Sequence, residues 1–293
     1  MRFLLAVLTC LMLSPAFAQD KPDLVEVVEI NGVINEFMAV TIASQVDAIN
    51  DNPKIRAVVL VVDTPGGGAS ASAAIYESLS KIKVPVVAWC NYLCASGGIY
   101  VLMAPSVKYI GVRQDTISGS VGVIAQMARF HRLLDFVKID VETYKSGRLK
   151  DAGNPTRAGQ EEERKYLQSI IDELAERFYG IVAKARPGIK DWDEVKTGKV
   201  FIGNQAVKVG LVDAIASRDQ VIKKAKELSG AKLIFTRDEI RKMSRVADSP
   251  PTVYQAPRQD ASPFGDIPWL ISLLKEIRAG ESVQFSYRMD YGF

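Results

Sequence analysis

The chain has 293 residues, of which 48% are apolar and 24% charged, a balance that is ordinary for globular proteins. Its 37 basic and 34 acidic residues leave a formal net charge of only +3, so nucleic acid is not an expected partner. The length allows one large domain or two smaller ones.

Residues 1–18 have the three-part layout of a secretory signal peptide. Arg2 is followed by an apolar run over residues 3–13, and the segment ends in the small-residue pattern A-F-A. The apolar run is shorter than the roughly 20 residues that span a membrane. We therefore expect a cleaved signal peptide and a periplasmic location. The alternative is that residues 3–18 stay uncleaved and anchor the chain in the inner membrane.

Strand-like and helix-like segments then alternate along the chain. A continuous β-branched run such as A-V-V-L-V-V at 57–62 is typical of a strand buried on both faces. The expected elements, in chain order, are strands at 24–30, 57–62, 84–89 and 139–143, and helices at 38–49, 73–82, 96–103, 156–185 and 219–228, with a turn-rich unit at 191–210 that leads into a last short strand. Strand followed by helix, several times over, predicts an α/β fold of repeated βαβ units.

The composition changes near residue 244. The segment 244–268 carries five prolines and is expected to be a linker or mobile tail. The apolar stripe W-L-I-S-L-L-K-E-I at 269–277 predicts either a helix that docks on the body or on another subunit, or contact with a membrane surface. The expected organisation is a main domain over 19–243, the linker, and an apolar C-terminal segment over 269–293.

Two cysteines, Cys90 and Cys94, remain once the signal peptide is removed. In an exported protein they could form a disulfide. They could equally be two small buried side chains. The sequence leaves both alternatives open.

The glycine-rich segment D-T-P-G-G-G at 63–68 follows a predicted buried strand and precedes a predicted helix. Such a turn exposes backbone N–H groups, which suits the binding of an anion or an oxyanion. It lacks the Lys-Ser/Thr of a phosphate-binding Walker loop and the spacing of a dinucleotide fingerprint. The alternative is a tight turn with no chemical role.

A second segment, A-S-G-G at 95–98, places Ser96 at the start of a predicted helix. The helix dipole there favours developing negative charge, and the glycines let a substrate backbone approach closely. A serine at this position can also be a plain helix cap.

A serine nucleophile needs a base, and the candidates are few. The single histidine, His131, lies among arginines, with Asp135 as the only carboxylate in its immediate segment. Lys145, in T-Y-K-S-G-R, would ordinarily be a solvated surface charge. A buried lysine whose pKa is lowered can act as a base, so Lys145 is the stronger candidate and His131 the weaker one.

Four motifs together resemble a known family. The segments D-T-P-G-G-G (63–68), A-S-G-G (95–98), S-G-S-V-G-V (118–123) and Y-K-S-G (144–147) are similar in order and spacing to those of the signal peptide peptidase A family of S49 serine proteases, over roughly residues 24–230. The resemblance implies a ClpP/crotonase-like fold.

The resemblance also implies a role for each matching residue. Ser96 corresponds to the nucleophile and Lys145 to the general base. Ser120 corresponds to the residue that orients the base, and the N–H groups of Gly67 and Gly97 to the oxyanion hole. No metal or cofactor is implied.

The implied activity is that of a serine endopeptidase that cleaves signal peptides or other short hydrophobic segments in the cell envelope. Members of the family form homo-oligomeric rings or domes, in which the serine and lysine of one site can come from neighbouring subunits. Two alternatives are a crotonase-type acyl-CoA enzyme and a non-catalytic assembly factor with the same fold.

Overall fold

The computed structural model describes residues 23–231 and 234–239. Its strands are β1 (Asp23–Asn31), β2 (Ile55–Thr64), β3 (Val86–Ala95), β4 (Val107–Val112), β5 (Ile117–Gly119), β6 (Val200–Ile202), β7 (Ala214–Ile215) and β8 (Ile234–Thr236). Its helices are α2 (Glu36–Asp51), α3 (Ala69–Ser80), α4 (Gly97–Leu102), α5 (His131–Phe136), α6 (Glu161–Ala185), α7 (Trp192–Lys196), α8 (Gly203–Val209) and α9 (Arg218–Ser229).

The strands form one sheet in the order β6-β5-β3-β2-β1-β8, with β4 paired to β3 and β7 paired to β4. Within the described residues, every strand pairing is parallel except that of β5 with β6. Parallel neighbours need crossover connections, which the helices between β1, β2 and β3 supply. The predicted α/β class is therefore confirmed.

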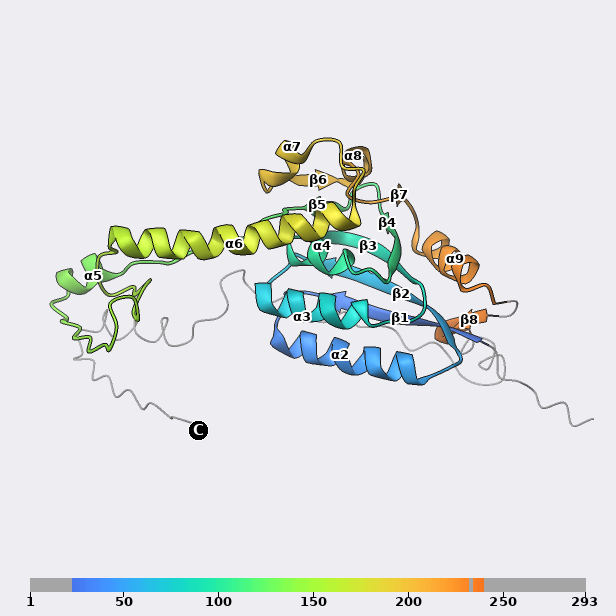
Figure 1. Ribbon diagram of the computed structural model, residues 1–293, viewed down its shortest axis with the longest axis horizontal. Helices are drawn as coiled ribbons and strands as arrows, with labels where there is room; N and C mark the ends of the chain where they lie inside the picture. Colours follow the sequence, from blue (N-terminus) through green and yellow to red (C-terminus); the bar gives the residue numbers. More distant parts are fainter. Residues whose placement is uncertain (1–22, 232–233, 240–293) are drawn as a thin grey trace, which may run out of the picture. The chain divides into compact units, whose positions relative to one another are not determined.

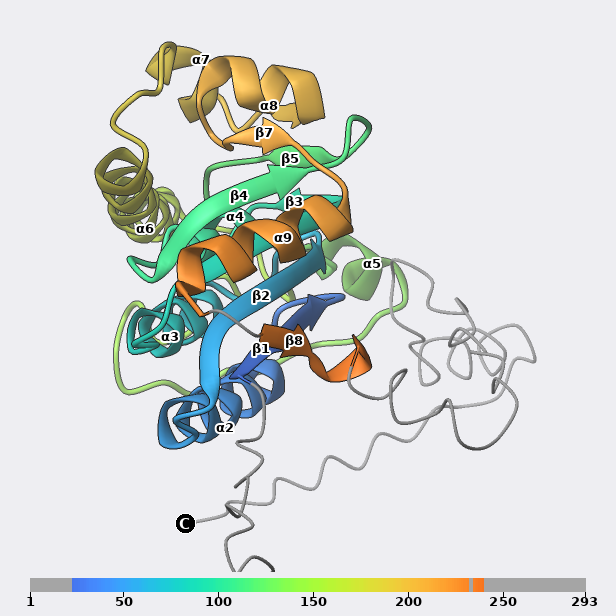
Figure 2. The same cartoon turned by 90° about the vertical axis from the view of Figure 1, so that its right-hand side faces the viewer.

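Helices cover both faces of the sheet (Figures 1 and 2). Helices α2, α3 and α4 lie over one face and α9 over the other. In β2, Val58, Leu60 and Val62 pack in the larger core with α2–α4, whereas Ala57 and Val59 pack in the smaller core under α9. Both sets are fully buried, which explains why this strand is a continuous apolar run and not an alternating one.

Strand β3 contains an irregularity just before the start of α4. Cys90 and Cys94 are four residues apart in β3 but pair with residues only two apart in β2. The residues between the two cysteines, 91–93, therefore bulge out of the strand pairing with β2. The Asp63 carboxylate holds them, because it accepts hydrogen bonds from the Leu93 N–H (3.0 Å) and the Asn91 side-chain amide (3.1 Å). Bulges of this kind redirect a strand and are common beside active sites.

The same irregularity brings the two cysteine side chains together. Both are fully buried free thiols, so of the two alternatives that the sequence left open, the structure has the small buried side chains and not the disulfide. Burial raises the pKa of the Cys94 thiol, and its hydrogen bond with Cys90 raises it further. A thiol in such surroundings is held in its unreactive protonated form.

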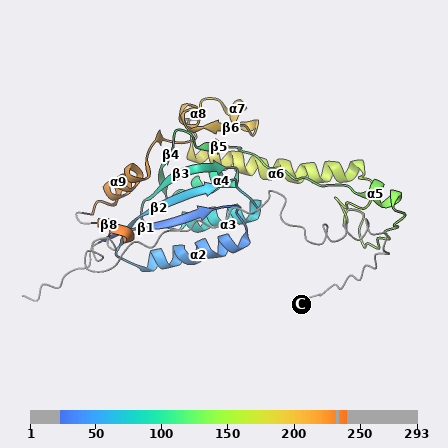
Figure 3. The ribbon, with the colours of Figure 1, turned by 180° about the vertical axis from the view of Figure 1, so that it is seen from behind.

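The C-terminal part of α6 packs near α4, and the first turns of α6 project beyond the sheet (Figures 1 and 3). Residues 125–160, which include α5, lead to and fold around these first turns. The Phe130 N–H donates to the Pro155 carbonyl (2.7 Å), and the Arg129 guanidinium donates to two carbonyls of the same returning segment. We call residues 125–160 with the first turns of α6 the arm.

Two sequence-based expectations about the arm are wrong. Residues 139–143 form no strand, because no other segment of the described chain pairs with them, and Ile139 and Val141 are 43% and 48% exposed. The helix expected from residue 156 begins at Glu161, where the Glu163 carboxylate caps the helix by accepting from the Gln160 N–H (3.1 Å).

Among the described helices, none has both the length and the apolar content that a membrane crossing requires. The predicted signal peptide (1–18), the proline-rich linker (244–268) and the apolar C-terminal segment (269–293) lie outside the described residues.

We predict that Asp63→Ala destabilises the fold by about 1–3 kcal/mol, because it leaves the Leu93 N–H and the Asn91 amide without their charged acceptor. Urea unfolding would measure this change. Asp115→Ala is the matched control, since the Asp115 side chain is 70% exposed and should change stability by less than about 0.5 kcal/mol. Equal stability of the Asp63→Ala variant and the parent would contradict the role given to Asp63.

Candidate active site

Ser96 lies on the turn between β3 and α4. Its backbone has φ 51° and ψ −118°, a left-handed conformation that a residue other than glycine rarely adopts. Two hydrogen bonds fix it there: the Ser96 N–H donates to the Gly119 carbonyl (2.8 Å), and the Ser96 carbonyl accepts from the Tyr100 N–H (3.1 Å). Strained residues held in this way concentrate at functional sites.

The glycine-rich turn touches the start of α4. The Ile34 N–H donates to the Gly66 carbonyl (2.8 Å), and the Gly68 N–H donates to the Ile34 carbonyl (2.9 Å). These two bonds hold the turn against Ile34 and do not involve the N–H of Gly67, the predicted oxyanion donor. Gly66 has φ 96°, and a Cβ placed on it would lie 2.7 Å from the Gly97 nitrogen. Glycine is therefore required where the turn meets the helix.

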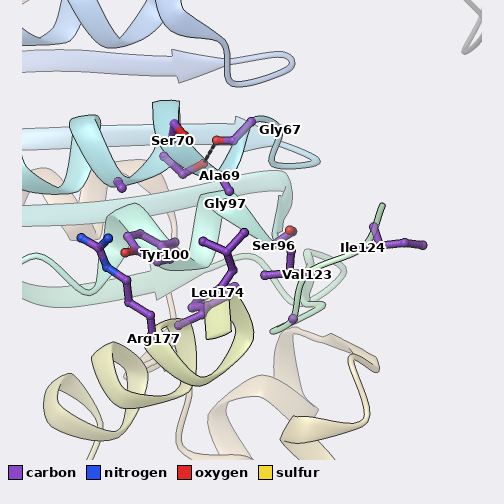
Figure 4. Close-up of a pocket in the computed structure, with 15 residues that line it drawn as sticks. Gly67, Ala69, Ser70, Ser96, Gly97, Tyr100, Val123, Ile124, Leu174 and Arg177 are labelled. Atoms are coloured by element: carbon purple, nitrogen blue, oxygen red, sulfur yellow. Dashed lines mark hydrogen bonds between the residues drawn. The ribbon is translucent and has the colours of Figure 1, made fainter. Parts of the chain in front are cut away.

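Ser96, Gly67 and Gly97 all line one pocket of about 300 Å³ (Figure 4). The structure thus brings together the predicted nucleophile and both predicted oxyanion donors. The other residues that line the pocket are Gly68, Ala69, Ser70, Ser72, Ala73, Tyr100, Gly122, Val123, Ile124, Leu174, Arg177 and Phe178.

The far wall of this pocket comes from α6, which the sequence did not link to the site. Leu174 and Phe178 supply its apolar part. The Tyr100 ring meets Phe178 at 5.0 Å and Tyr76 at 5.6 Å between ring centroids, an arrangement that fixes the ring in place.

Ser120, the predicted base-orienting residue, follows β5 directly. The preceding residue, Gly119, pairs with Ala95 and accepts the Ser96 N–H, so Ser120 lies on the segment adjoining Ser96. It also has a left-handed φ of 51°, and its N–H donates to the Lys199 carbonyl (2.9 Å).

Lys145, the predicted base, lies in the arm and does not line the pocket. Its ammonium group donates to Asp151 (2.5 Å) and to the Arg148 carbonyl (3.1 Å). Asp151 also accepts from Arg157 (2.8 Å), and Arg157 pairs with the buried Glu163 in the first turn of α6.

This ionic network ties Lys145 to the projecting end of α6. Leu174, on the pocket wall, is eleven residues further along that helix, or about 16 Å along its axis. Arg157 and then Lys145 hold the pKa of Asp151 well below its usual range. Arg157 also lowers the pKa of Glu163, so both carboxylates stay ionised at neutral pH.

His131, the weaker base candidate, is the first residue of α5 and also lies in the arm. Its Nδ1 is buried and has no hydrogen-bond partner within the described residues. Neither candidate base therefore lines the Ser96 pocket of the same chain. No group of three His, Cys, Asp or Glu side chains in the described ranges could hold a metal ion.

The sequence matches two protein-family models. The model of Peptidase family S49 matches residues 78–232, more than half of the chain, and the Clp protease model matches residues 24–109. The second match spans β1, β2 and β3 with their helices, so the sheet is of the ClpP-like class, as predicted.

Three curated relatives are similar over about two thirds of the chain. The chain is 36% identical over 205 residues to an Enterococcus faecium protein named as signal peptide peptidase SppA (67% of this chain, 58% of the relative). It is 34% identical over 186 residues to a Methanocaldococcus jannaschii protein named as a protease (62% and 59%). It is 31% identical over 206 residues to a Synechocystis protein named as a protease (69% and 73%). The match spans about three fifths of the length of the first two relatives.

The left-handed backbone of Ser96 predicts an order of stability between two variants that both lack its hydroxyl. Ser96→Gly should have a free energy of unfolding about 1–2 kcal/mol higher than Ser96→Ala, because glycine adopts positive φ without the clash of a Cβ. Denaturant unfolding of the two variants side by side measures the difference. If Ser96→Ala is as stable as Ser96→Gly, Ser96 carries no backbone strain.

Proposed function

The chain belongs to peptidase family S49, and on that premise we propose that it is a serine endopeptidase with Ser96 as nucleophile and Lys145 as general base. The observation that carries the proposal is the meeting of three features at one pocket: a serine on a strained strand-to-helix turn, and two glycine segments that line the same pocket. Family membership also favours this function over an acyl-CoA reaction.

The proposed reaction begins with attack of Ser96 Oγ on a peptide carbonyl. The N–H groups of Gly67 and Gly97 would hold the oxyanion, and one such donor typically contributes about 3–4 kcal/mol to the transition state. Lys145, without its proton, takes the proton of Ser96 and passes it to the leaving amine. Ser120 orients the lysine, and water then hydrolyses the acyl-enzyme.

We propose that Lys145 reaches Ser96 from a neighbouring copy of the chain. Within one chain the Lys145 network and the pocket wall are separated by about 16 Å along α6. The arm also exposes large apolar side chains, among them Phe136 (81%), Tyr144 (90%) and Leu133 (59%). A surface of this kind marks a contact with another protein. A repeated arm-to-body contact between copies would close into a ring.

The proposed substrates are signal peptides or other short hydrophobic segments in the cell envelope. The apolar pocket beside Ser96 suits such side chains, and one relative bears the name of a signal peptide peptidase. The signal-like residues 1–18 support a periplasmic location. The apolar stripe at 269–277 is proposed to contact the assembly or the membrane surface.

Labelling by a fluorophosphonate probe tests the proposed dyad. The assembled wild-type protein should be labelled on Ser96, because only an activated serine attacks such a probe. Ser96→Ala should abolish labelling. Lys145→Met should lower it by at least about 100-fold, the usual contribution of a general base.

Lys150→Ala is the matched control for the lysine, since Lys150 is an exposed residue of the same arm. It should label like the wild type. Unlabelled wild-type assembly would contradict the protease proposal and favour a non-catalytic role for the fold. Full labelling of Lys145→Met would leave the nucleophile in place but overturn the assignment of the base.

A further inference from the structure

Among the described residues that line the Ser96 pocket, Arg177 is the only charged one. It projects from α6 at the end of the pocket beside Tyr100, and Leu174 lies between it and Ser96 (Figure 4). Glycines, serines and apolar side chains make up nearly all of the remaining wall. A single cation in such a wall provides selectivity for a group of opposite charge.

The protein itself satisfies the Arg177 guanidinium only weakly. Its nearest carboxylate oxygen, on Glu77, is 3.7 Å away, which is beyond hydrogen-bonding distance. The side chains of Arg177 and Glu77 are 59% and 62% exposed, and an ion pair of this kind contributes little. The Tyr100 hydroxyl also interacts with the guanidinium, and the other donors of the planar fork remain available to a ligand.

Tyr100 provides a second donor at the same end of the pocket. Its ring is packed between Tyr76 and Phe178 and is only 7% exposed. Burial raises the pKa of Tyr100, and the nearby Arg177 opposes that shift only in part. The phenol therefore keeps its proton at neutral pH and can donate a hydrogen bond beside the guanidinium.

We propose that Arg177 and Tyr100 bind a carboxylate of the peptide substrate, so that the site selects an apolar peptide that carries a negative charge near the bond to be cut. The inference rests on the proposed function and specifies its substrate class. Tyr100 follows Ser96 by one turn of α4, about 6 Å along the axis. With about 3.5 Å per extended residue, the carboxylate lies within a few residues of the scissile bond.

Two sources could supply this carboxylate: an Asp or Glu side chain, or the free C-terminus of a peptide. A free C-terminus is what an earlier peptide-bond hydrolysis leaves on the released segment. Charge-assisted, bidentate bonds from arginine recognise either source.

Binding to the full-length Ser96→Ala protein tests the proposal without turnover. The probes are fluorescent apolar octapeptides in four forms: C-terminal acid or amide, with either Glu or Gln at an inner position. We expect the acid, the Glu peptide or both to bind about 10-fold more tightly than the uncharged peptide, which is about 1.4 kcal/mol. The two pairs of peptides identify the source.

Adding Arg177→Gln should remove this preference, and Arg177→Lys should restore part of it as a point charge. Arg164→Gln is the control, because Arg164 is an exposed arginine of the same helix that pairs with Glu161 outside the pocket. In the hydrolytic protein, Arg177→Gln should raise KM for the preferred peptide and leave kcat unchanged.

Equal binding of all four peptides would overturn the inference, as would a preference that survives Arg177→Gln. Failure of the proposed function looks different. In that case the wild-type protein hydrolyses none of the peptides, and the carboxylate preference of the Ser96→Ala protein is still measured.

Discussion

The Gly66–Gly67 turn and the start of α4 meet backbone to backbone, and every proposed catalytic feature of the serine half depends on this approach. A Cβ on Gly66 would press on the Gly97 nitrogen and on Ser96, and one on Gly67 would overlap the backbone of Ile34. Because the turn is this close, Gly67 and Gly97 line the same pocket. The bulge in β3, which the Asp63 carboxylate holds, lies just before Ser96. It therefore helps to determine where β3 ends and where Ser96 is placed.

The serine and lysine halves of the site are built by different means. Ser96 directly follows β3, a central strand of the sheet, and the two hydrophobic cores on either face hold that strand in place. Lys145 lies in the arm, where a network of ion pairs runs from Lys145 through Asp151 and Arg157 to Glu163. In the single chain its ammonium donates to Asp151, and the proposed base must leave this contact and lose a proton before it can accept the proton of Ser96. Assembly of copies thus becomes the step that would complete the site.

The fold around Ser96 can be predicted from the sequence far better than the fold around Lys145, for physical reasons. Buried parallel strands are continuous apolar runs, so 57–62 was recognisable, and short glycine motifs require special backbone geometry. The strand expected at 139–143 was wrong because its apolar residues face solvent in the arm. The pocket wall could not be predicted, since Leu174 and Arg177 come from α6, far from Ser96 in sequence. The sequence gives no sign that Asp151 and Arg157 differ from ordinary surface charges, and only the structure shows that they form a network with Lys145.

The most direct test of the shared site is complementation between two inactive variants. Ser96→Ala keeps the lysine, Lys145→Met keeps the serine, and co-expression allows mixed assemblies to form. If each site takes its serine and lysine from different copies, about a quarter of the interfaces in a random mixture carry both residues, and peptidase activity returns. Mixed assemblies that form but stay inactive would contradict this account.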